Sequence, residues 1–167
     1  MAVDMFLLLD KIEGETQDNK FTKGDSGLPR AIDVLSWSWG MSNPATGHTG
    51  GGSGTGKVNV HDVSVTKYID ASSAALAQYC ATGEHIAKGK LVVRKAGGTA
   101  LEYLTFDMEQ IFITGITTGG SAGEDRLTEN ISLNFSKIKK TYATQKADGT
   151  KDKEKEFTYD VAKNVKV

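Results

Sequence analysis

Apolar residues recur at every second position along most of the chain, which is the pattern of β-strands with one face on a core. Near the N-terminus, apolar residues occupy both parities of this alternation. One parity carries Val3, Met5, Leu7 and Leu9, and the other carries Phe6, Leu8 and Ile12. We therefore predict a first strand that is buried on both sides.

A second strand is predicted where large apolar side chains alternate with serines. Leu35, Trp37 and Trp39 share one face, while Ser36 and Ser38 share the other. A strand of this kind has a wide apolar face for a core and a small, uncharged face for solvent or a partner.

Two irregular segments and one helix interrupt the strands. Charge and glycine in residues 19–29 predict a loop. The valines before His61 and Asp62 have the opposite parity to those after them, which predicts a bulge or bend. A short amphipathic helix follows, with Ser72 as its N-cap and Gly83 at its end.

The second half of the chain predicts further strands and a fold class. Residues 91–93 and 101–108 are expected to form a hairpin, and residues 111–116 a further strand. Another strand is expected over residues 131–142, with a parity change near Ser136. After a turn at 147–149, residues 157–167 are expected to form the strand that closes the sheet. About eight strands and one helix predict a mainly β fold, either a closed β-barrel or two packed sheets. We expect a single domain over residues 1–167.

Composition narrows the classes of function. Lys plus Arg number 20 and Asp plus Glu number 21, a balance that argues against a nucleic-acid binder. Cys80 is the single cysteine, so we expect a small buried hydrophobe in a reducing compartment. The chain has no run of 18 apolar residues and no leader pattern at its N-terminus. We therefore expect a cytoplasmic starting point and no membrane insertion.

Two motifs imitate enzyme sites. Gly51, Gly56 and Lys57 have the spacing of a phosphate-binding loop, but Val58 stands where a hydroxyl must ligate magnesium, and a strand pattern follows instead of a helix. Residues 119–123 (GGSAG) match a hydrolase nucleophile elbow around Ser121. In that fold the catalytic histidine follows the serine, whereas the last histidine here is His85.

The sequence gives little support for a metal site or for an acid–base site. His48, His61 and His85 lack the spacing and cysteine companions of a metal site. Glu124, Asp125 and Glu129, beside Arg126, are best explained as a solvated or interfacial charge cluster. We expect no catalytic set, no metal and no cofactor.

Several segments together resemble a known family. They are residues 1–6 (MAVDMF), 33–42 (DVLSWSWGMS), 56–70 (GKVNVHDVSVTKYID), 91–98 (LVVRKAGG) and 117–135 (TTGGSAGEDRLTENISLNF). In this order they resemble the Hcp (haemolysin-coregulated protein) family, the tube proteins of bacterial type VI secretion systems. The resemblance extends from residue 1 to about residue 142, and the 19–29 segment and the lysine-rich tail depart from it.

The resemblance implies a structural role and a fold shared with phage tail tubes. It implies a homo-hexameric ring that stacks into a tube inside a contractile sheath, beneath a VgrG-type spike protein. The tube carries small effector proteins into a target cell and is itself secreted without a cleaved signal peptide. A head-to-tail ring requires two different complementary surfaces on each subunit.

The same reasoning assigns candidate residues to two surfaces. Ser36, Ser38 and Ser121 are candidates for the lumen and for contact with effectors, although a plain solvent face or tight turn explains them equally well. The loop after the second strand is the candidate contact between subunits or rings. Its residues are Asn43, His48, Gly51, Gly52, Ser53, Gly54 and Thr55.

Two alternatives stay open. One is a tail-tube subunit of a phage or phage-like contractile particle. The other is a monomeric secreted module that captures a partner peptide at a strand edge.

Overall fold

The computed structural model describes residues 2–45, 47, 56–96 and 100–167. Its strands, one helix and one 3-10 turn are β1 (Val3–Leu9), η1 (Phe21–Lys23), β2 (Ile32–Ser38), β3 (Met41–Ser42), β4 (Asn59–Val60), β5 (Val63–Tyr68), α1 (Ser73–Thr82), β6 (Ile86–Lys95), β7 (Leu101–Gly119), β8 (Thr128–Asn134), β9 (Lys137–Gln145), β10 (Lys151–Asp160) and β11 (Val165–Lys166). None of the helices among these residues has the length and apolar character needed to cross a membrane.

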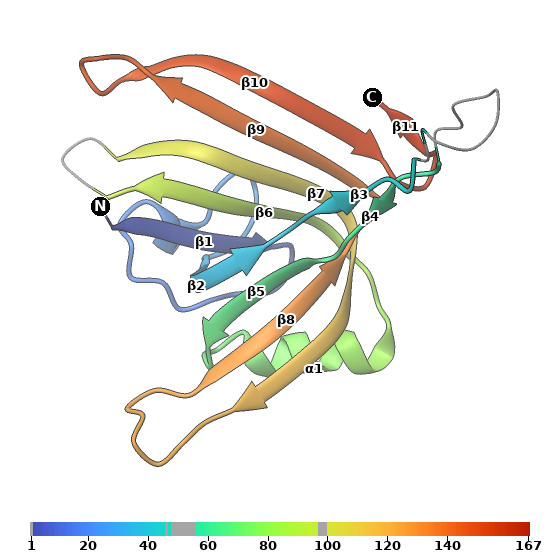
Figure 1. Cartoon of the computed structure of the whole chain (residues 1–167). Coiled ribbons are helices and arrows are strands. Elements are labelled where there is room, and N and C mark those ends of the chain that lie inside the picture. The colour runs from blue at the N-terminus through green and yellow to red at the C-terminus, as the bar shows by residue number, and fades with distance from the viewer. Residues whose placement is uncertain (1, 46, 48–55, 97–99) are drawn as a thin grey trace.

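Six antiparallel strands close into a barrel in the order β7, β6, β1, β2, β5, β8 and back to β7 (Figure 1). Of the two architectures that the sequence left open, the closed barrel is therefore confirmed. The strand that closes it was misplaced, because β8 pairs with the C-terminal half of β7. Residues 157–166 lie instead at the outer edge of the sheet.

The 19-residue strand β7 makes this closure possible. Its first half pairs with β6 on one edge and β9 on the other, and its second half pairs with β8. Separate strands over 101–108 and 111–116 were predicted, but the strand is continuous. The buried positions shift parity between Met108 and Ile111, where Gln110 adopts a left-handed backbone (φ 51°). This local irregularity bends β7 from one pairing to the other.

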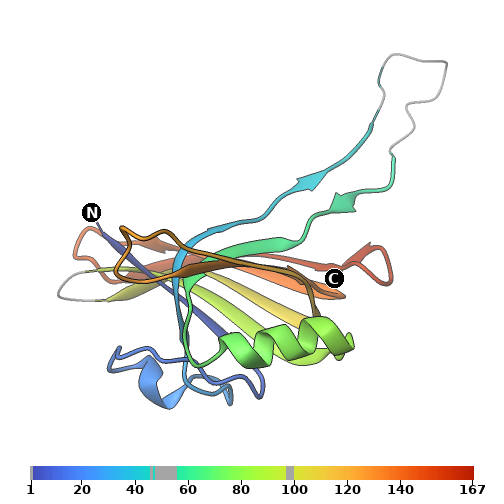
Figure 2. The same cartoon turned by 90° about the horizontal axis from the view of Figure 1, so that it is seen from below.

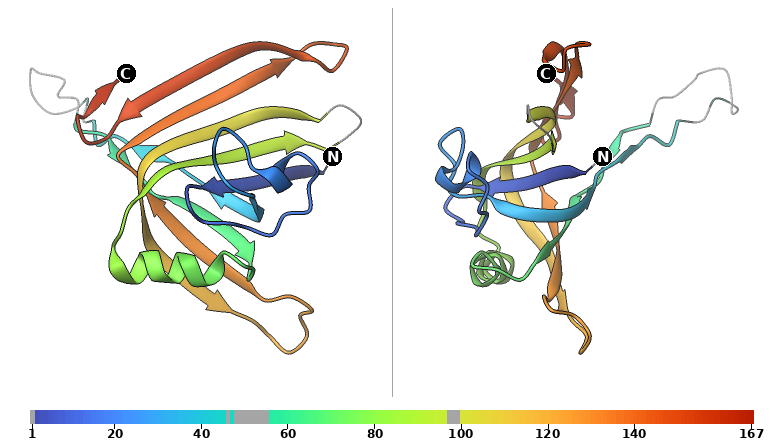
Figure 3. Two further views of the ribbon diagram at one scale, coloured as in Figure 1. Left: turned by 180° about the vertical axis from the view of Figure 1, so that it is seen from behind. Right: turned by 90° about the vertical axis from the view of Figure 1, so that its left-hand side faces the viewer.

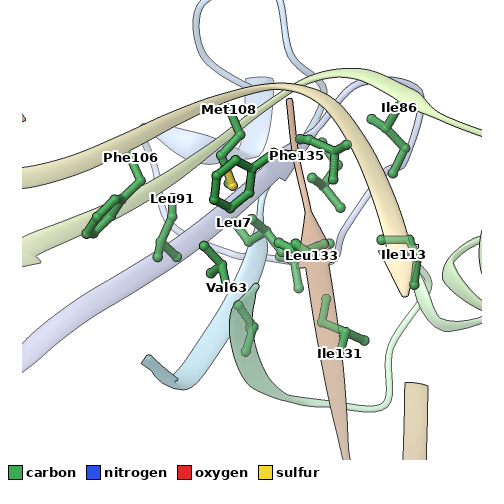
Figure 4. Close-up of a cluster of buried hydrophobic side chains, with 14 of the residues drawn as sticks. Leu7, Val63, Ile86, Leu91, Phe106, Met108, Ile113, Ile131, Leu133 and Phe135 are labelled. Carbon is green, nitrogen blue, oxygen red and sulfur yellow. The ribbon is translucent and has the colours of Figure 1, made fainter. Parts of the chain in front are cut away.

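The barrel is filled by apolar side chains from every strand that forms it (Figure 4). Leu7 and Leu9 belong to this core, whereas Phe6 and Leu8 pack on the opposite side with a second cluster that includes Phe21. The prediction that β1 is buried on both faces is confirmed. Ile12 was assigned to the outer face, but the chain turns after Leu9 and brings it into the barrel core.

The second strand differs from its predicted pattern at one residue. The register with β5 shifts between Val34 and Ser36, so Val34 faces the core and Leu35 is 38% exposed. Leu35 therefore does not share the apolar face of Trp37 and Trp39. Those two rings lie edge-on against the ring of Phe106, with centroids 5.1 and 5.6 Å away.

The bend predicted near His61 is confirmed, and Ser72 is at the N-cap position of α1 as predicted. The single strand predicted over residues 131–142 is divided in two. Strand β4 ends before His61, and β8 gives way to β9 around Ser136. Gly83 ends α1 in a left-handed conformation (φ 69°), as expected. The Ser72 side chain makes no cap hydrogen bond to the helix backbone. Its backbone N–H instead donates to Asp70 Oδ1 at 2.9 Å.

Two features project from the barrel, one seen in Figure 1 and the other in Figure 2. We call β9, β10 and β11 the flap, which continues the sheet beyond β7, and its hairpin turns at Gly149 as predicted. We call β3 and β4 the arm, a two-stranded ladder that extends from β2 and β5. The helix α1 lies against β7, with Leu76 in the barrel core and Cys80 only partly buried.

A buried ion cluster joins α1 to the barrel. Lys67 and Glu129 are cross-strand partners on β5 and β8, both almost fully buried, and they form an ion pair. The Lys67 Nζ lies 3.1 Å from Asp70 Oδ1, and Ser73 Oγ donates to Glu129 Oε1 at 2.7 Å. Glu129 was expected in a solvated cluster with Glu124 and Asp125. Its strand parity places it inside, where Lys67 compensates its charge.

Removing one member of this cluster is expected to destabilise the fold strongly. Lys67→Met leaves Glu129 buried without its cation, so we expect the free energy of unfolding to fall by about 3–5 kcal/mol. The double variant Lys67→Met with Glu129→Leu is expected to regain most of that loss. Urea unfolding followed by circular dichroism measures both.

An exposed ion pair provides the control. Lys139 and Glu156 are each about half exposed and lie 3.3 Å apart, so Lys139→Met is expected to change the unfolding free energy by less than about 1 kcal/mol. A double variant less stable than Lys67→Met alone would contradict this account of the cluster.

Candidate assembly surfaces

The serines of β2 belong to an uncharged surface that crosses four strands. Ser36 is aligned with Thr66 of β5, Asn130 of β8 and Thr117 of β7 in one row, and the row through Ser38 contains Ser64, Ser132 and Gly115. Ser36 and Ser38 are exposed. We call these two rows the polar face. It forms because valine, isoleucine and leucine at the alternate positions turn inward to the barrel core.

Hydrogen bonds tie the polar face together. Thr66 Oγ1 donates to Asn130 Oδ1 at 2.6 Å. At one end, Asp62 accepts from Thr114 Oγ1 at 2.6 Å and from Asn134 Nδ2 at 2.9 Å, so both of its oxygens are occupied. The surface is therefore small, polar and firmly held, with its nearest carboxylate already satisfied.

Sequence reasoning found only the β2 part of this surface. The residues of β5 and β8 carry the same alternation, in VSVTKY and TENISLN. Their place beside Ser36 and Ser38 depends on strand register, which alternation within each strand does not give.

Ser121 lies apart from the other two candidate serines. It is exposed in the loop of residues 120–127 that joins β7 to β8, beyond the end of the polar face. The strand β8 follows this loop, not the helix of a nucleophile elbow. The last histidine is far from this loop. The His85 ring lies 6.1 Å from the Phe112 ring, and Phe112 is seven positions before Gly119, where β7 ends, which corresponds to about 23 Å of strand.

The loop candidates fall mostly outside the described part of the chain. Asn43 is described and is exposed just beyond β3. His48, Gly51, Gly52, Ser53, Gly54 and Thr55 lie outside the described residues. Lys57, the last residue of the imitation phosphate-binding loop, precedes strand β4 and not a helix. The base of the arm is held by the His61 N–H, which donates to Gly40 O at 3.0 Å.

The opposite side of β1 and β6 is covered by the chain's own loop. Arg94 of β6 donates to Asp4 at 3.0 Å and also to Asp18, and it lies over the rings of Phe6 and Phe21. The Arg94 guanidinium lowers the pKa of Asp18 by hydrogen bonding to it. Residues 19–29, predicted as a loop, are thus fastened to the barrel and cover this side of β1 and β6.

The flap has an excess of basic over acidic residues, whereas the rest of the chain has an excess of acidic residues. Residues 137–167 contain nine lysines and five acidic residues, whereas residues 1–136 contain 11 basic and 16 acidic residues. Residues 151–156 of β10 alternate lysine with aspartate or glutamate, and all are exposed. Alternating charge along an outer strand discourages indiscriminate edge pairing.

The described residues contain no group of three or more His, Cys, Asp or Glu side chains able to hold a metal ion. The acidic residues that lie close together inside the protein are bound to Lys67, and Glu124 and Asp125 are exposed to solvent. The described surface presents polar rows, charged ends and exposed apolar side chains.

The chain matches a known protein family along most of its length. Residues 6–142 match the family described as the type VI secretion system effector Hcp. The chain is 45% identical over 153 residues to the protein hcp1 of Pseudomonas aeruginosa, covering 91% of this chain and 90% of the relative.

Solved structures share the fold along the full length. The structure of a type six secretion system protein superposes with a TM-score of 0.89 at 25% identity, covering 99% of this chain and 100% of the other. Hcp1 from Salmonella typhimurium superposes with a TM-score of 0.78 at 34% identity, and both chains are covered completely. The chain belongs to the Hcp family of type VI secretion system proteins.

Proposed function

We propose that this protein is the ring-forming subunit of a type VI secretion tube. Family membership is the observation that carries the proposal, and the surfaces support it. One side of the barrel is covered by the chain's own loop, while the polar face, the flap and the arm are left for partners. Six copies would form a ring head to tail, and rings would stack into a tube.

The role is structural and needs no catalysis. The tube would lie within a contractile sheath, meet a spike protein of the VgrG type at its end, and carry small effector proteins. The subunit would be made in the cytoplasm and leave the cell when the tube is propelled outward, without a cleaved signal peptide. A family described as a secretion system effector fits a tube protein that is itself exported.

The polar face would line the lumen. Short, uncharged side chains leave room for cargo and bind it weakly, because they offer it no charges to pair with and little apolar surface to bury. Ser36 and Ser38 are at the centre of this assignment, and Ser121 would lie where the polar face ends.

The arm would contact a neighbouring subunit or ring. It projects well away from the barrel (Figure 2), and residues 43–55 would meet the partner there.

The ring itself is the first thing to test. Purified protein is expected to elute with the mass of about six protomers in light scattering coupled to size exclusion, and negative-stain images are expected to show rings. A monomer at micromolar concentration would contradict the proposal and favour a secreted binding module. Rings that assemble with a phage-type tail but with no type VI spike would favour the phage-like particle.

The lumen assignment predicts a size-dependent reactivity. In a Cys80→Ser background, Ser38→Cys is expected to react with a small maleimide at similar rates in the ring and in the dissociated subunit. A maleimide on a bulky polymer is expected to react more slowly with the ring, by about 10-fold, because the channel restricts its access. Mass spectrometry follows the labelling.

Gln78→Cys provides a comparison on the exposed side of α1. It is expected to accept both reagents equally in the ring. If the bulky reagent labels Ser38→Cys at the same rate in the ring and in the dissociated subunit, the assignment of the polar face to the lumen is wrong.

The arm assignment predicts an effect on stacking alone. Gly51→Asp with Gly54→Asp places two larger, charged side chains where each proposed ring contact would bury them, so stacking is expected to weaken by about 10-fold or more. Ring mass and thermal unfolding are expected to be unchanged. Electron microscopy of tubes measures their length, and tubes as long as the wild type would refute the assignment.

A further inference from the structure

The two ends of the molecule differ in charge and in shape. The flap lies at one end and the loop of residues 120–127 lies at the other, in the views of Figure 1 and Figure 3 alike. The flap is rich in lysine, and the loop carries the exposed acids Glu124 and Asp125. A head-to-tail contact joins two different ends of identical molecules.

The flap contains a shallow groove of about 240 Å³ with an apolar floor. Tyr142 and Phe157 form the floor, and Lys140 and Lys155 stand at its rim. These residues share one face, because Phe157 is aligned with Lys140 and Lys155 with Tyr142 across β9 and β10. Tyr142 is 47% exposed. Within the barrel this face of the sheet points to the core, but the flap extends past the barrel, where no other strand covers it.

Lys140 and Lys155 carry the positive charge of the groove, and the Lys140 ammonium lies 5.9 Å from the Phe106 ring of its own subunit. Glu156, also at the rim, is paired with Lys139. Among the ion pairs formed by described residues, none involves Lys140 or Lys155. The groove therefore offers two lysine ammonium groups beside an aromatic floor, which suits an apolar side chain flanked by carboxylates.

The loop at the other end presents that combination. Leu127 is 48% exposed and directly follows Glu124, Asp125 and Arg126. Arg126 is also exposed, but its guanidinium stacks on the Tyr68 ring of its own subunit, 3.8 Å from the centroid. The loop thus presents Leu127 with two carboxylates, beside a guanidinium that is held against its own subunit.

The loop is also held in place. The Ile69 N–H donates to Leu127 O at 2.9 Å, and the Glu124 N–H donates to Ser121 O at 3.1 Å. A Cβ on Gly120 would lie 2.2 Å from Leu127 Cδ2, so any larger residue at position 120 would make the Leu127 side chain shift. A pre-organised loop loses little conformational entropy on binding.

We propose that the groove of the flap receives the Leu127 loop of a second copy of this chain. Leu127 packs on Tyr142 and Phe157, while Glu124 and Asp125 lie against Lys140 and Lys155. The inference rests on the proposed ring, for which it supplies the contact between adjacent subunits. The same chain carries groove and loop at opposite ends, so each copy engages two neighbours and the contact repeats around the ring.

Charge-exchange variants test the contact. The groove variant is Lys140→Glu with Lys155→Glu, and the loop variant is Glu124→Lys with Asp125→Lys. Each places like charges across every contact, so we expect rings to dissociate at a protein concentration about 10-fold higher or more than the wild type. Light scattering coupled to size exclusion over a dilution series measures this concentration.

Recovery of ring assembly distinguishes this contact from a general effect of the added charges. A 1:1 mixture of the two variants is expected to form rings again, because every groove of one variant then meets a loop of opposite charge on the other. A chain carrying all four substitutions is expected to assemble within about threefold of the wild type. Leu127→Ser is expected to weaken assembly equally at low and high salt, whereas the charge effects shrink in high salt.

Lys11→Glu with Lys23→Glu is the matched control, since both lysines are exposed and the change in net charge is the same. It is expected to assemble like the wild type. Thermal unfolding checks that all variants fold. A wild-type protein that remains monomeric would overturn the proposed ring, and this contact with it.

Two results would overturn the contact alone. One is that the wild type forms rings and the groove variant assembles as well as the control variant does. The other is a groove variant that dissociates and recovers neither in the mixture nor in the fourfold variant, because its lysines would then meet a different surface.

Discussion

One strand, β7, is the constraint on which the rest of the structure depends. It pairs with β6 and β9 along its first half and with β8 along its second half, so it belongs both to the barrel and to the flap. The left-handed Gln110 changes the direction of the strand between the two halves. Without that bend the barrel would stay open at β8, and the flap and the polar face would lose their fixed relation.

The buried and the exposed charges of this protein have different roles. The buried charges are compensated inside the subunit, as Lys67 is by Glu129 and Asp70, because an isolated charge in the interior is costly. Arg94 likewise uses its charge to fasten the N-terminal loop. Lys140 and Lys155 of the flap and Glu124 and Asp125 of the Leu127 loop are exposed and belong to none of the ion pairs among the described residues. At such positions charge complementarity contributes mainly specificity and association rate.

The residue pattern predicted the β class, the buried first strand and the end of the helix, because alternation and a left-handed glycine are local signals. It failed where a single residue shifts the register. The bulge at Leu35 and the bend at Gln110 each reverse the parity of the residues that follow, and neither has a distinct composition. Ile12 was misassigned because a turn, not the strand, decides where it lies.

The candidate surfaces were predicted only in part for the same reason. Ser36 and Ser38 are visible in one strand, but the rows through Thr66, Asn130 and Ser132 exist only once the barrel has closed. The acidic cluster was split by parity, with Glu129 turned inward and Asp125 outward. The family resemblance supplied what alternation does not, the expectation of an assembly.

The order of strands in the barrel also governs how the chain folds during synthesis. Val3 of β1 pairs with Lys95 of β6, and the closing strand β8 ends at Asn134. Pairings so distant in sequence form slowly, and strands that wait for them expose apolar faces and unpaired edges. The ribosome-bound chain therefore exposes apolar side chains of β1 until β6 has been made. A chaperone that binds extended apolar segments would protect the protein there, well before any assembly begins.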